Sequence, residues 1–488
     1  MPGLNASLFL GLSGLQAQQS ALNVVGHNIA NVNTPGYSRQ RADLTANQAL
    51  IQGQVYFGTG VTLNAVQGLR DRFLDLQIYR ETSRQEGASE RYTGIEAVST
   101  SLGDTTSSGI AAQIQAFFQG FQELSARPED SALRTNLIGK ANTMISGMQA
   151  RYRMLNDQRD NANQAVTSLV TEVNTLTKQI ADLNREITGE LVPGSNNDAR
   201  DQRKSLTDKL STLVGISVFE GSHGEYQITL DSGLAVLVSG QTSFDLKATP
   251  DATLDNNYYR VDSLMGTTTV NVTADIRDGQ LGGKLDLRDR ILVDFQQQLD
   301  TLAAGLASQV NLQHRAGFDL NGVAGQDFFL SGVANGANGI PALMTAANAY
   351  KGMVNALTVN AAVAGNPKLI AAGGIAAAGD NANAKRLANL QLDGGVNAAG
   401  VVLGASYSSV VGTLINDVGT TAQTWEAQTT AQENLVSALQ AQRDRLSGVD
   451  LDEEAANMMI LQRGYQASAR FLSVINQLTD QLVNEFGK

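Results

Sequence analysis

The chain reads SALNVVGHNIANVNTPGYSRQR over residues 20–41, and this stretch decides how the polypeptide begins. Within it and just upstream, an aliphatic residue recurs every seven positions, at Leu8, Leu15, Leu22 and Ile29. That spacing places one apolar stripe along a helix and turns it toward a partner helix. We therefore predict an N-terminal helix with an apolar seam.

The residues that follow predict where this helix stops. Asn31 suits a helix C-terminus, and a proline at position 35 disfavours helical geometry in Thr34 before it. The pair Pro35-Gly36 is typical of a type II turn, because glycine tolerates the positive φ that such a turn requires. The chain is thus expected to leave the helix through a sharp turn.

A second apolar seam lies at the other end of the chain. One heptad position holds Leu451, Met458, Tyr465, Leu472 and Phe486, and another holds Leu461, Ile475 and Leu482. A helix over 450–486 would carry both positions on one side. Each seam is too long and narrow for a compact core, so the terminal helices are predicted to pair as a coiled coil or to pack on neighbouring copies.

Both ends resemble motifs shared by the axial proteins of the bacterial flagellum, a family of rod, hook and junction proteins. The resemblance is carried by ALNVVGHNIANVNTPGYSRQ at 21–40 and VDLDEEAANMMILQRGYQASARFLSVINQL at 449–478. Two interior stretches, NDARDQRKSLTDKL at 197–210 and HRAGFDLNGVAGQDFF at 314–329, also match. Within the family, the run from Tyr37 to Arg41 is more similar to the hook-associated junction members than to hook proteins.

This resemblance implies a structural protein, not an enzyme, that joins hook to filament as a ring of subunits. The implied partners are further copies of the chain, the hook protein, the second hook-associated protein, an export chaperone and the type III export apparatus. Export to the flagellum outside the cell without a cleaved signal peptide is also implied. Two alternatives stay open, namely a hook or rod protein of the same family, and a secreted wall hydrolase or adhesin with axial-type ends.

The same resemblance implies assembly contacts at the terminal motifs. The expected interface comprises Leu8, Leu15, Leu22, Asn28, Ile29, Asn31, Pro35, Gly36, Tyr37, Leu451, Met458, Leu461, Tyr465, Leu472, Ile475, Leu482 and Phe486. The export chaperone is expected to cover the C-terminal helix at Leu461, Tyr465, Leu472 and Ile475. A free monomer offers these seams little to bury against, which favours disorder of both ends before assembly.

The composition limits the classes of function. With 488 residues the chain is long enough for two to four domains. A formal net charge of −12 argues against a nucleic-acid-binding protein, which needs a basic face. The lack of cysteine excludes disulfides and thiolate metal sites. No apolar run reaches the roughly 18 residues of a membrane span, and residues 1–29 lack the pattern of a secretory signal.

Between its ends the chain is predicted to be mainly α with a β insertion. The steps of three and four residues from Ala162 to Ile187 predict a long helix over 129–188, and a similar pattern predicts another over 405–447. Strand patterns dominate 216–276, and a hairpin is expected where Val55–Leu63 alternates around two glycines.

These patterns suggest a division into three parts. The predicted parts are a terminal coiled-coil domain of 1–40 and 448–488, an elongated rod-like helical body of 41–215 and 277–447 with a peripheral Ala/Gly/Asn-rich elaboration at 331–404, and an inserted β domain at 216–276.

Several stretches of the sequence partly resemble known chemical motifs. The three histidines, His27, His223 and His314, lie too far apart in sequence for a known metal or catalytic motif. The stretch GQLGGK at 279–284 lacks the first glycine and the final Ser or Thr of a phosphate loop. No metal or cofactor is therefore expected.

Two charged clusters suggest structural roles. Asp450, Asp452 and Glu454 have the spacing of a calcium loop but lack its glycine and its last acidic ligand, so Asp450 is expected to cap the last helix. The charged residues of 200–203 are expected to form intramolecular salt bridges, with a subunit contact as the alternative.

Overall fold

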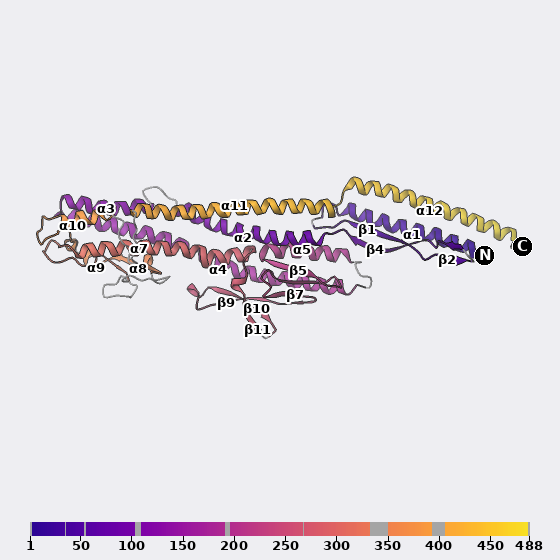
Figure 1. The fold of residues 1–488 in the computed structure, drawn as a ribbon, viewed down its shortest axis with the longest axis horizontal. Helices are drawn as coiled ribbons and strands as arrows, with labels where there is room; N and C mark the ends of the chain where they lie inside the picture. The colour runs from indigo at the N-terminus through magenta and orange to yellow at the C-terminus, as the bar shows by residue number, and fades with distance from the viewer. Residues whose placement is uncertain are drawn as a thin grey trace. The chain divides into compact units, whose positions relative to one another are not determined.

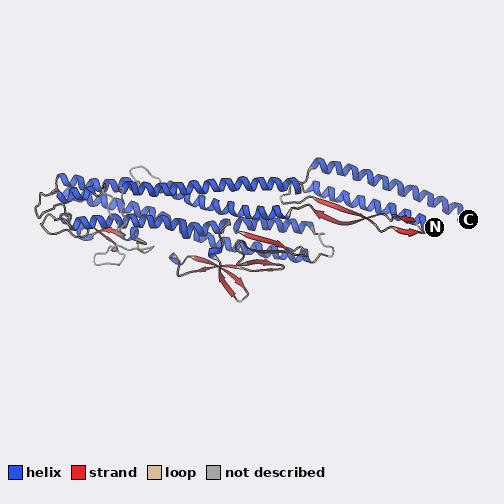
Figure 2. Cartoon of the chain, viewed as in Figure 1, coloured by secondary structure: helices blue, strands red, loops and turns tan. Residues whose placement is uncertain are grey.

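Helices make up most of the chain, with small antiparallel sheets beside them (Figures 1 and 2). The computed structural model describes residues 2–34, 36–52, 55–102, 109–190, 196–266, 268–331, 350–392 and 406–486. These residues confirm the predicted class, mainly α with a β insertion. Within the described residues, no helix is both long and apolar enough to cross a membrane.

The long helices fall where the sequence predicted them. The α-helices are α1 Pro2–Ala30, α2 Arg72–Leu102, α3 Ile110–Ala126, α4 Ser131–Thr188, α5 Asn197–Leu213, α6 Gly279–Asp286, α7 Leu292–Arg315, α8 Met353–Ala356, α9 Ala361–Gly365, α10 Ala382–Asn389, α11 Tyr407–Ser447 and α12 Leu451–Phe486. Shorter turns are η1 Asp255–Asn257, η2 Thr273–Asp275, the π-helical η3 Leu287–Ile291 and η4 Pro367–Leu369. The apolar positions that predicted α4, from Ala162 to Ile187, are all buried.

The chain forms two compact units. The first comprises Met1–Gly87, Thr167–Gly282 and Thr430–Lys488, and the second comprises Ala88–Val166 and Gly283–Thr429. The predicted division into three parts remains a prediction.

In the first unit, α1 and α12 pack against each other with both chain ends at the same side (Figure 1). The register is antiparallel, because Gly11 of α1 faces Leu472 of α12 while Gln18 faces Gly464. A Cβ atom at Gly11 would lie 2.9 Å from Leu472 Cδ1. Glycines that weaken each helix by itself therefore let the two helices approach closely.

Four short strands follow α1, namely β1 Gln40–Ala46, β2 Leu50–Gln52, β3 Val55–Phe57 and β4 Val61–Gly68. The expected hairpin over 55–63 is wrong, since β3 pairs with β2 and β4 pairs with β1. Alternating apolar and polar residues predict a strand, but they do not show which other strand pairs with it. Here β1 and β4 both pack on α1, and a Cβ atom at Gly60 would collide with Ser13 Oγ of that helix.

The β insertion is confirmed as two antiparallel sheets in the first unit. The strands β5 Ile216–Glu220, β6 Tyr226–Leu230, β7 Val236–Ser239 and β8 Thr242–Ser243 pair in sequence order, and β9 Leu246–Pro250, β10 Tyr259–Met265 and β11 Thr268–Asn271 pair in the order β11-β10-β9. Two asparagines of α4 fasten the helix to these sheets. Asn184 Nδ2 donates to Tyr226 O at 2.9 Å, and Asn174 Nδ2 donates to Leu246 O at 2.8 Å.

The second unit has one large core, in which Phe117 of α3 contacts Phe328 and Phe329. The strands β12 Phe329–Ser331 and β13 Leu357–Val359 form a two-stranded sheet beside it. Much of the region 331–404, whose fold the sequence did not predict, belongs to this core, because α10 packs on α3 and α7. Residues 332–349 and 393–404 of that region lie outside the described residues.

Candidate assembly site at the chain ends

The predicted seam residues lie mostly between α1 and α12. Half-buried positions are Leu8, Leu15, Leu22, Ile29, Asn31, Gly36, Tyr37, Met458, Leu461, Tyr465, Leu472 and Leu482. Asn28 and Ile475 are buried, and Leu451 is exposed. Pro35 and the side chain of Phe486 lie outside the described residues. Part of the predicted seam is therefore covered within one chain, where α1 packs on α12.

A second set of apolar side chains on α12 is left exposed. Ile460, Phe471, Val474 and Leu478 are 66%, 40%, 52% and 45% exposed. They are separated by eleven, three and four residues, which places them on one side of a helix. We call this set the outer apolar face. The most regular heptads predict only the seam, although the residues of the outer apolar face recur with the same helical periodicity.

Exposed apolar side chains also occur on α1, at Phe9, Leu10 and Leu12. Large apolar side chains that are exposed in groups often mark a surface that binds another molecule. The α1–α12 pair therefore has an internal contact, through the seam, and further apolar surface available to other molecules.

Asn28 fixes the connection that leaves α1. Its side chain is 1% exposed, its Nδ2 donates to Gln40 O at 2.8 Å, and its Oδ1 accepts from Gln40 N at 2.9 Å. The same oxygen accepts from the Tyr37 hydroxyl at 2.8 Å. Burial raises the pKa of Tyr37, so the hydroxyl keeps the proton that it donates. His27 Nδ1 lies 3.0 Å from the same Tyr37 hydroxyl.

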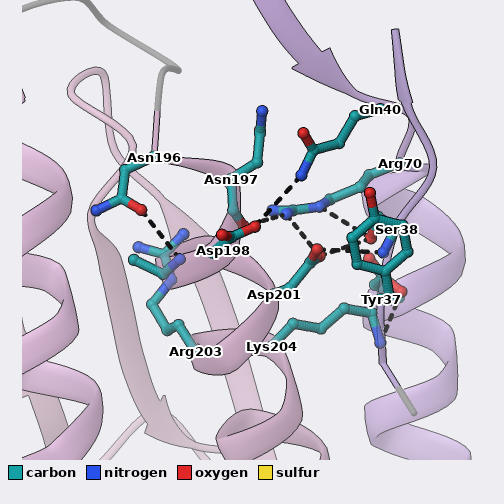
Figure 3. A network of polar contacts seen from close by, with 12 residues as sticks. Tyr37, Ser38, Gln40, Arg70, Asn196, Asn197, Asp198, Asp201, Arg203 and Lys204 are labelled. Atoms are coloured by element: carbon teal, nitrogen blue, oxygen red, sulfur yellow. Dashed lines mark hydrogen bonds and ion pairs between the residues drawn. The ribbon is translucent and has the colours of Figure 1, made fainter. Parts of the chain in front are cut away.

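The helix α5 holds the same connection from the other side (Figure 3). Ser38 Oγ donates to Asp201 Oδ1 at 2.8 Å, and Ser38 N donates to Asp201 Oδ2 at 3.2 Å. Arg70 Nη2 pairs with Asp201 Oδ1 at 2.7 Å. Burial raises the pKa of Asp201 although Arg70 and Ser38 oppose that shift. Intramolecular salt bridges in the 200–203 cluster are confirmed by Asp201 and by Arg200, which pairs with Glu190 at 3.0 Å.

Arg39 connects this region to α12. Its Nε donates to Glu454 Oε1 at 2.7 Å, and its two Nη atoms donate to Glu453 at 2.7 and 2.9 Å. Its backbone N–H donates to Ser447 O at 2.9 Å. The predicted cap is also present, because Asp450 Oδ1 accepts from Asp452 N at 2.9 Å. The ends of α1, α11 and α12 are thus joined by residues of one short segment.

Family models match three parts of the chain. Residues 95–329 match the model of the flagellar hook-associated protein FlgK helical domain. Residues 10–37 match the flagella basal body rod protein model, and residues 440–485 match the flagellar basal body rod FlgEFG protein C-terminal model. The match at 10–37 covers most of α1 and part of the connection after it, and the match at 440–485 covers the end of α11 and nearly all of α12.

Similarity to individual proteins extends over nearly the whole chain. Flagellar hook-associated protein 1 of Escherichia coli (strain K12) is 30% identical over 97% of this chain and 98% of its own length. The protein of the same name from Bacillus subtilis (strain 168) is 29% identical over 99% of both chains. The solved structure of the flagellar hook junction protein FlgK from Burkholderia pseudomallei covers 75% of this chain and 99% of its own, with a TM-score of 0.65 and 20% identity.

Proposed function

Because the chain belongs to the flagellar hook-associated protein 1 family, the structural proteins of the hook–filament junction in the bacterial flagellum, we propose that its α1–α12 pair is the assembly element. In this proposal the pair forms a coiled coil in the inner layer of a tube. A rod-like helical body and the inserted β domain lie outside it, as the predicted division into three parts requires. A ring of such copies stands between the hook protein and the second hook-associated protein.

The observation that carries this proposal is the outer apolar face of α12. Ile460, Val474 and Leu478 are exposed, whereas the seam beside them is packed on α1. Phe471 is 40% exposed, although its ring also reaches Gly11 of α1. Covering one Leu or Ile fully contributes about 1.5 to 3 kcal/mol, so these residues on each copy would contribute favourable free energy to a ring. The seam residues contribute indirectly, by holding α1 and α12 together so that both present their exposed apolar side chains.

The proposed route to this place is export through the flagellar type III apparatus without a cleaved signal, ending outside the cell. An export chaperone would cover α12 at Leu461, Tyr465, Leu472 and Ile475 until assembly. These residues are partly shielded by α1 in the structure. The chaperone would therefore have to bind α12 before α1 does, or displace α1.

The extent of similarity supports the junction over the rod or hook alternative. Only residues 10–37 and 440–485 match the rod models, whereas the relatives named hook-associated protein 1 match nearly the full length. A deletion strain tests this distinction. It is expected to build complete hooks and to release flagellin monomers into the medium, and strains without hooks would instead support the rod or hook alternative.

The alternative of a secreted wall hydrolase has a separate test. The family is structural, so purified protein is expected to give no clearing in a peptidoglycan gel. Clear lysis would contradict the proposal.

The outer apolar face is tested by substitution. The double change of Ile460 and Val474 to Asp is expected to leave a folded monomer that cannot form junctions, because charge replaces exposed apolar surface. The matched control changes the exposed polar residues Gln462 and Gln477 to Asp, which adds the same charge to the same helix. Flagellin loss into the medium is the measurement. Normal junctions in the Ile460/Val474 variant would refute the proposed contact.

A second double variant separates the seam from the outer face. Leu472 and Ile475 lie on the α1 side of α12, so changing both to Asp is expected to detach α1 as well as to abolish assembly. The thermal transition of the rest of the chain should remain. Its loss would show that α12 belongs to the core of the monomer.

A further inference from the structure

The joint between α11 and α12 consists of three residues, Gly448, Val449 and Asp450. Each helix is terminated locally. Gly448 N donates to Asp444 O at 2.8 Å, where a Cβ would collide with that oxygen, and Asp450 caps the first turn of α12. Local termination ends one helix and starts the next, but it leaves the angle between them undetermined.

The packing around the joint does not fix the angle between α11 and α12 either. A cavity of about 460 Å³ lies beside the joint, lined by residues 447–449 and by the end of the α1–β1 connection. Its lining includes the charged residues Arg70, Lys204 and Arg443 beside two valines, Val32 and Val449. Close-packed interiors resist movement, whereas a cavity gives neighbouring segments room to shift.

One residue contacts both sides of the joint. Arg39 binds the last residue of α11 through its backbone and the first turn of α12 through its guanidinium. Two of the guanidinium bonds form a fork on Glu453, and the third reaches Glu454. A planar fork on a carboxylate defines an orientation, which a single flexible ammonium does not.

The backbone of Arg39 is itself held in place. Its carbonyl accepts from Leu69 N at 2.8 Å. The residue before it, Ser38, is bound to Asp201 of α5, and the residue after it, Gln40, is bound to Asn28 of α1. The guanidinium therefore projects from a fixed point of the first unit.

We propose that Arg39 is a positioning residue that sets the direction of α12 relative to α11, and with it the direction of the α1–α12 pair. Its importance for assembly rests on the proposed function, because the outer apolar face can meet a neighbouring copy only if every monomer presents it in the same direction. The geometry itself is a property of the monomer.

The burial of Glu454 gives the contact its strength. Glu454 is 1% exposed, and its second oxygen, Oε2, has no hydrogen-bond partner among the described residues. Without Arg39 a buried carboxylate would lose its cation, which is strongly unfavourable. At neutral pH, a movement of α12 at the joint that brings Glu454 into water relieves this cost without protonating the carboxylate. Loss of Arg39 should therefore change the helix direction as well as lower stability.

The experiment measures a distance across the joint in the purified monomer. Because the chain contains no cysteine, Ser437→Cys in α11 and Gln466→Cys in α12 provide two unique positions for spin labels. Both residues are exposed. Pulsed electron paramagnetic resonance is expected to give one narrow distance in the doubly labelled parent and in an Arg41→Ala control, which removes an exposed arginine two residues away.

Arg39→Ala should lose the single narrow distance and give a broad or shifted distribution. Arg39→Lys keeps a positive charge beside Glu454 but loses the fork on Glu453, so it should give a distribution broader than that of the parent. The Glu453→Gln/Glu454→Gln variant should resemble Arg39→Ala. A lower melting temperature with an unchanged distance in Arg39→Ala would show that Arg39 only stabilises, and would overturn the proposal. If Arg39→Ala does not fold, an unaltered distance in the glutamine variant overturns it.

These outcomes do not depend on assembly. A narrow distance in every variant refutes the role of Arg39 while the tests of the outer apolar face still stand. Conversely, normal junctions in the Ile460/Val474 variant would refute the proposed contact surface and leave the monomer geometry intact.

Discussion

Gly464 of α12 lies directly against Gln18 of α1, so that a Cβ atom at position 464 would be 3.0 Å from Gln18 Cδ. A glycine in a helix interior costs about 1 kcal/mol relative to alanine. The space that the missing side chain leaves is taken by the flexible end of Gln18, which can move aside.

The substitution Gly464→Ala is expected to stabilise the α1–α12 pair by about 0.5 kcal/mol, because the atoms it meets are the flexible end of Gln18 and the helix gains propensity. Gly11→Ala meets Leu472 and the ring of Phe471 instead, and is expected to destabilise the pair. Hydrogen exchange of α12 amides would measure both. Slower exchange in Gly11→Ala than in Gly464→Ala would contradict the packing argument.

Asn28 provides a test of the connection that leaves α1. Asn28→Ala removes a partner from Gln40 N, Gln40 O and the Tyr37 hydroxyl, and unpaired buried groups cost about 1 to 3 kcal/mol each. We expect faster hydrogen exchange in β1 and at the start of α12. The control Asn23→Ala changes an exposed asparagine of the same helix and should have little effect. Equal effects of the two substitutions would show that the buried network contributes nothing.

Two buried groups of the second unit predict opposite responses to acid. Burial lowers the pKa of His314 to about 4, and burial raises the pKa of Asp300 to about 6. His314 accepts from Ala371 N and contacts Gln326 O, and Asp300 accepts from Gly352 N and Val354 N. Each pKa shift corresponds to a change in the free energy of unfolding on the order of 3 kcal/mol over the pH range in which the group titrates.

His314 and Asp300 change the free energy of unfolding in opposite directions, because the proton is taken up by the unfolded chain in one case and by the folded chain in the other. Between pH 6.5 and 4 the unfolded chain protonates His314 and the folded chain does not, so this group lowers the free energy of unfolding as pH falls. Between pH 6 and about 4 the folded chain protonates Asp300 first, so this group raises the free energy of unfolding as pH falls. In the parent the two effects largely cancel.

Urea unfolding at several pH values should separate the contributions of His314 and Asp300 to stability. Relative to the parent, the stability of His314→Gln should rise on acidification from pH 6 to 4, and the stability of Asp300→Asn should fall. The comparison uses the slope with pH, so a uniform loss of stability in either variant does not affect it. Identical slopes in the parent and both variants would contradict the burial argument.

Limited proteolysis tests the state of the chain ends in the monomer. Most seam residues are only half-buried, and α12 has few buried positions, so local opening of α1 and α12 should need less free energy than opening of α4. A protease is expected to remove both ends before it cuts α4. Protection of both ends in a verified monomer would refute the prediction that they order on assembly.

The sequence by itself determined the helices and the family. Heptads predicted α1 and α12, steps of three and four predicted α4, and the acidic start of α12 predicted its cap at Asp450. These features depend on local periodicity and on side chains close to their own backbone. The terminal motifs identified the flagellar axial family for the same reason, because they are contiguous in the chain.

Only the tertiary structure decided which segments meet. The pairing of β1 with β4 and the contact of Arg39 with Glu454 join residues that are not neighbours in sequence. The exposure of Ile460 depends on which side of α12 is covered by α1. A period shows which side of a helix is apolar, but not which partner covers it or what remains uncovered. That choice depends on close packing and on the need to pair buried charges, which are set by the whole unit and not by any local stretch.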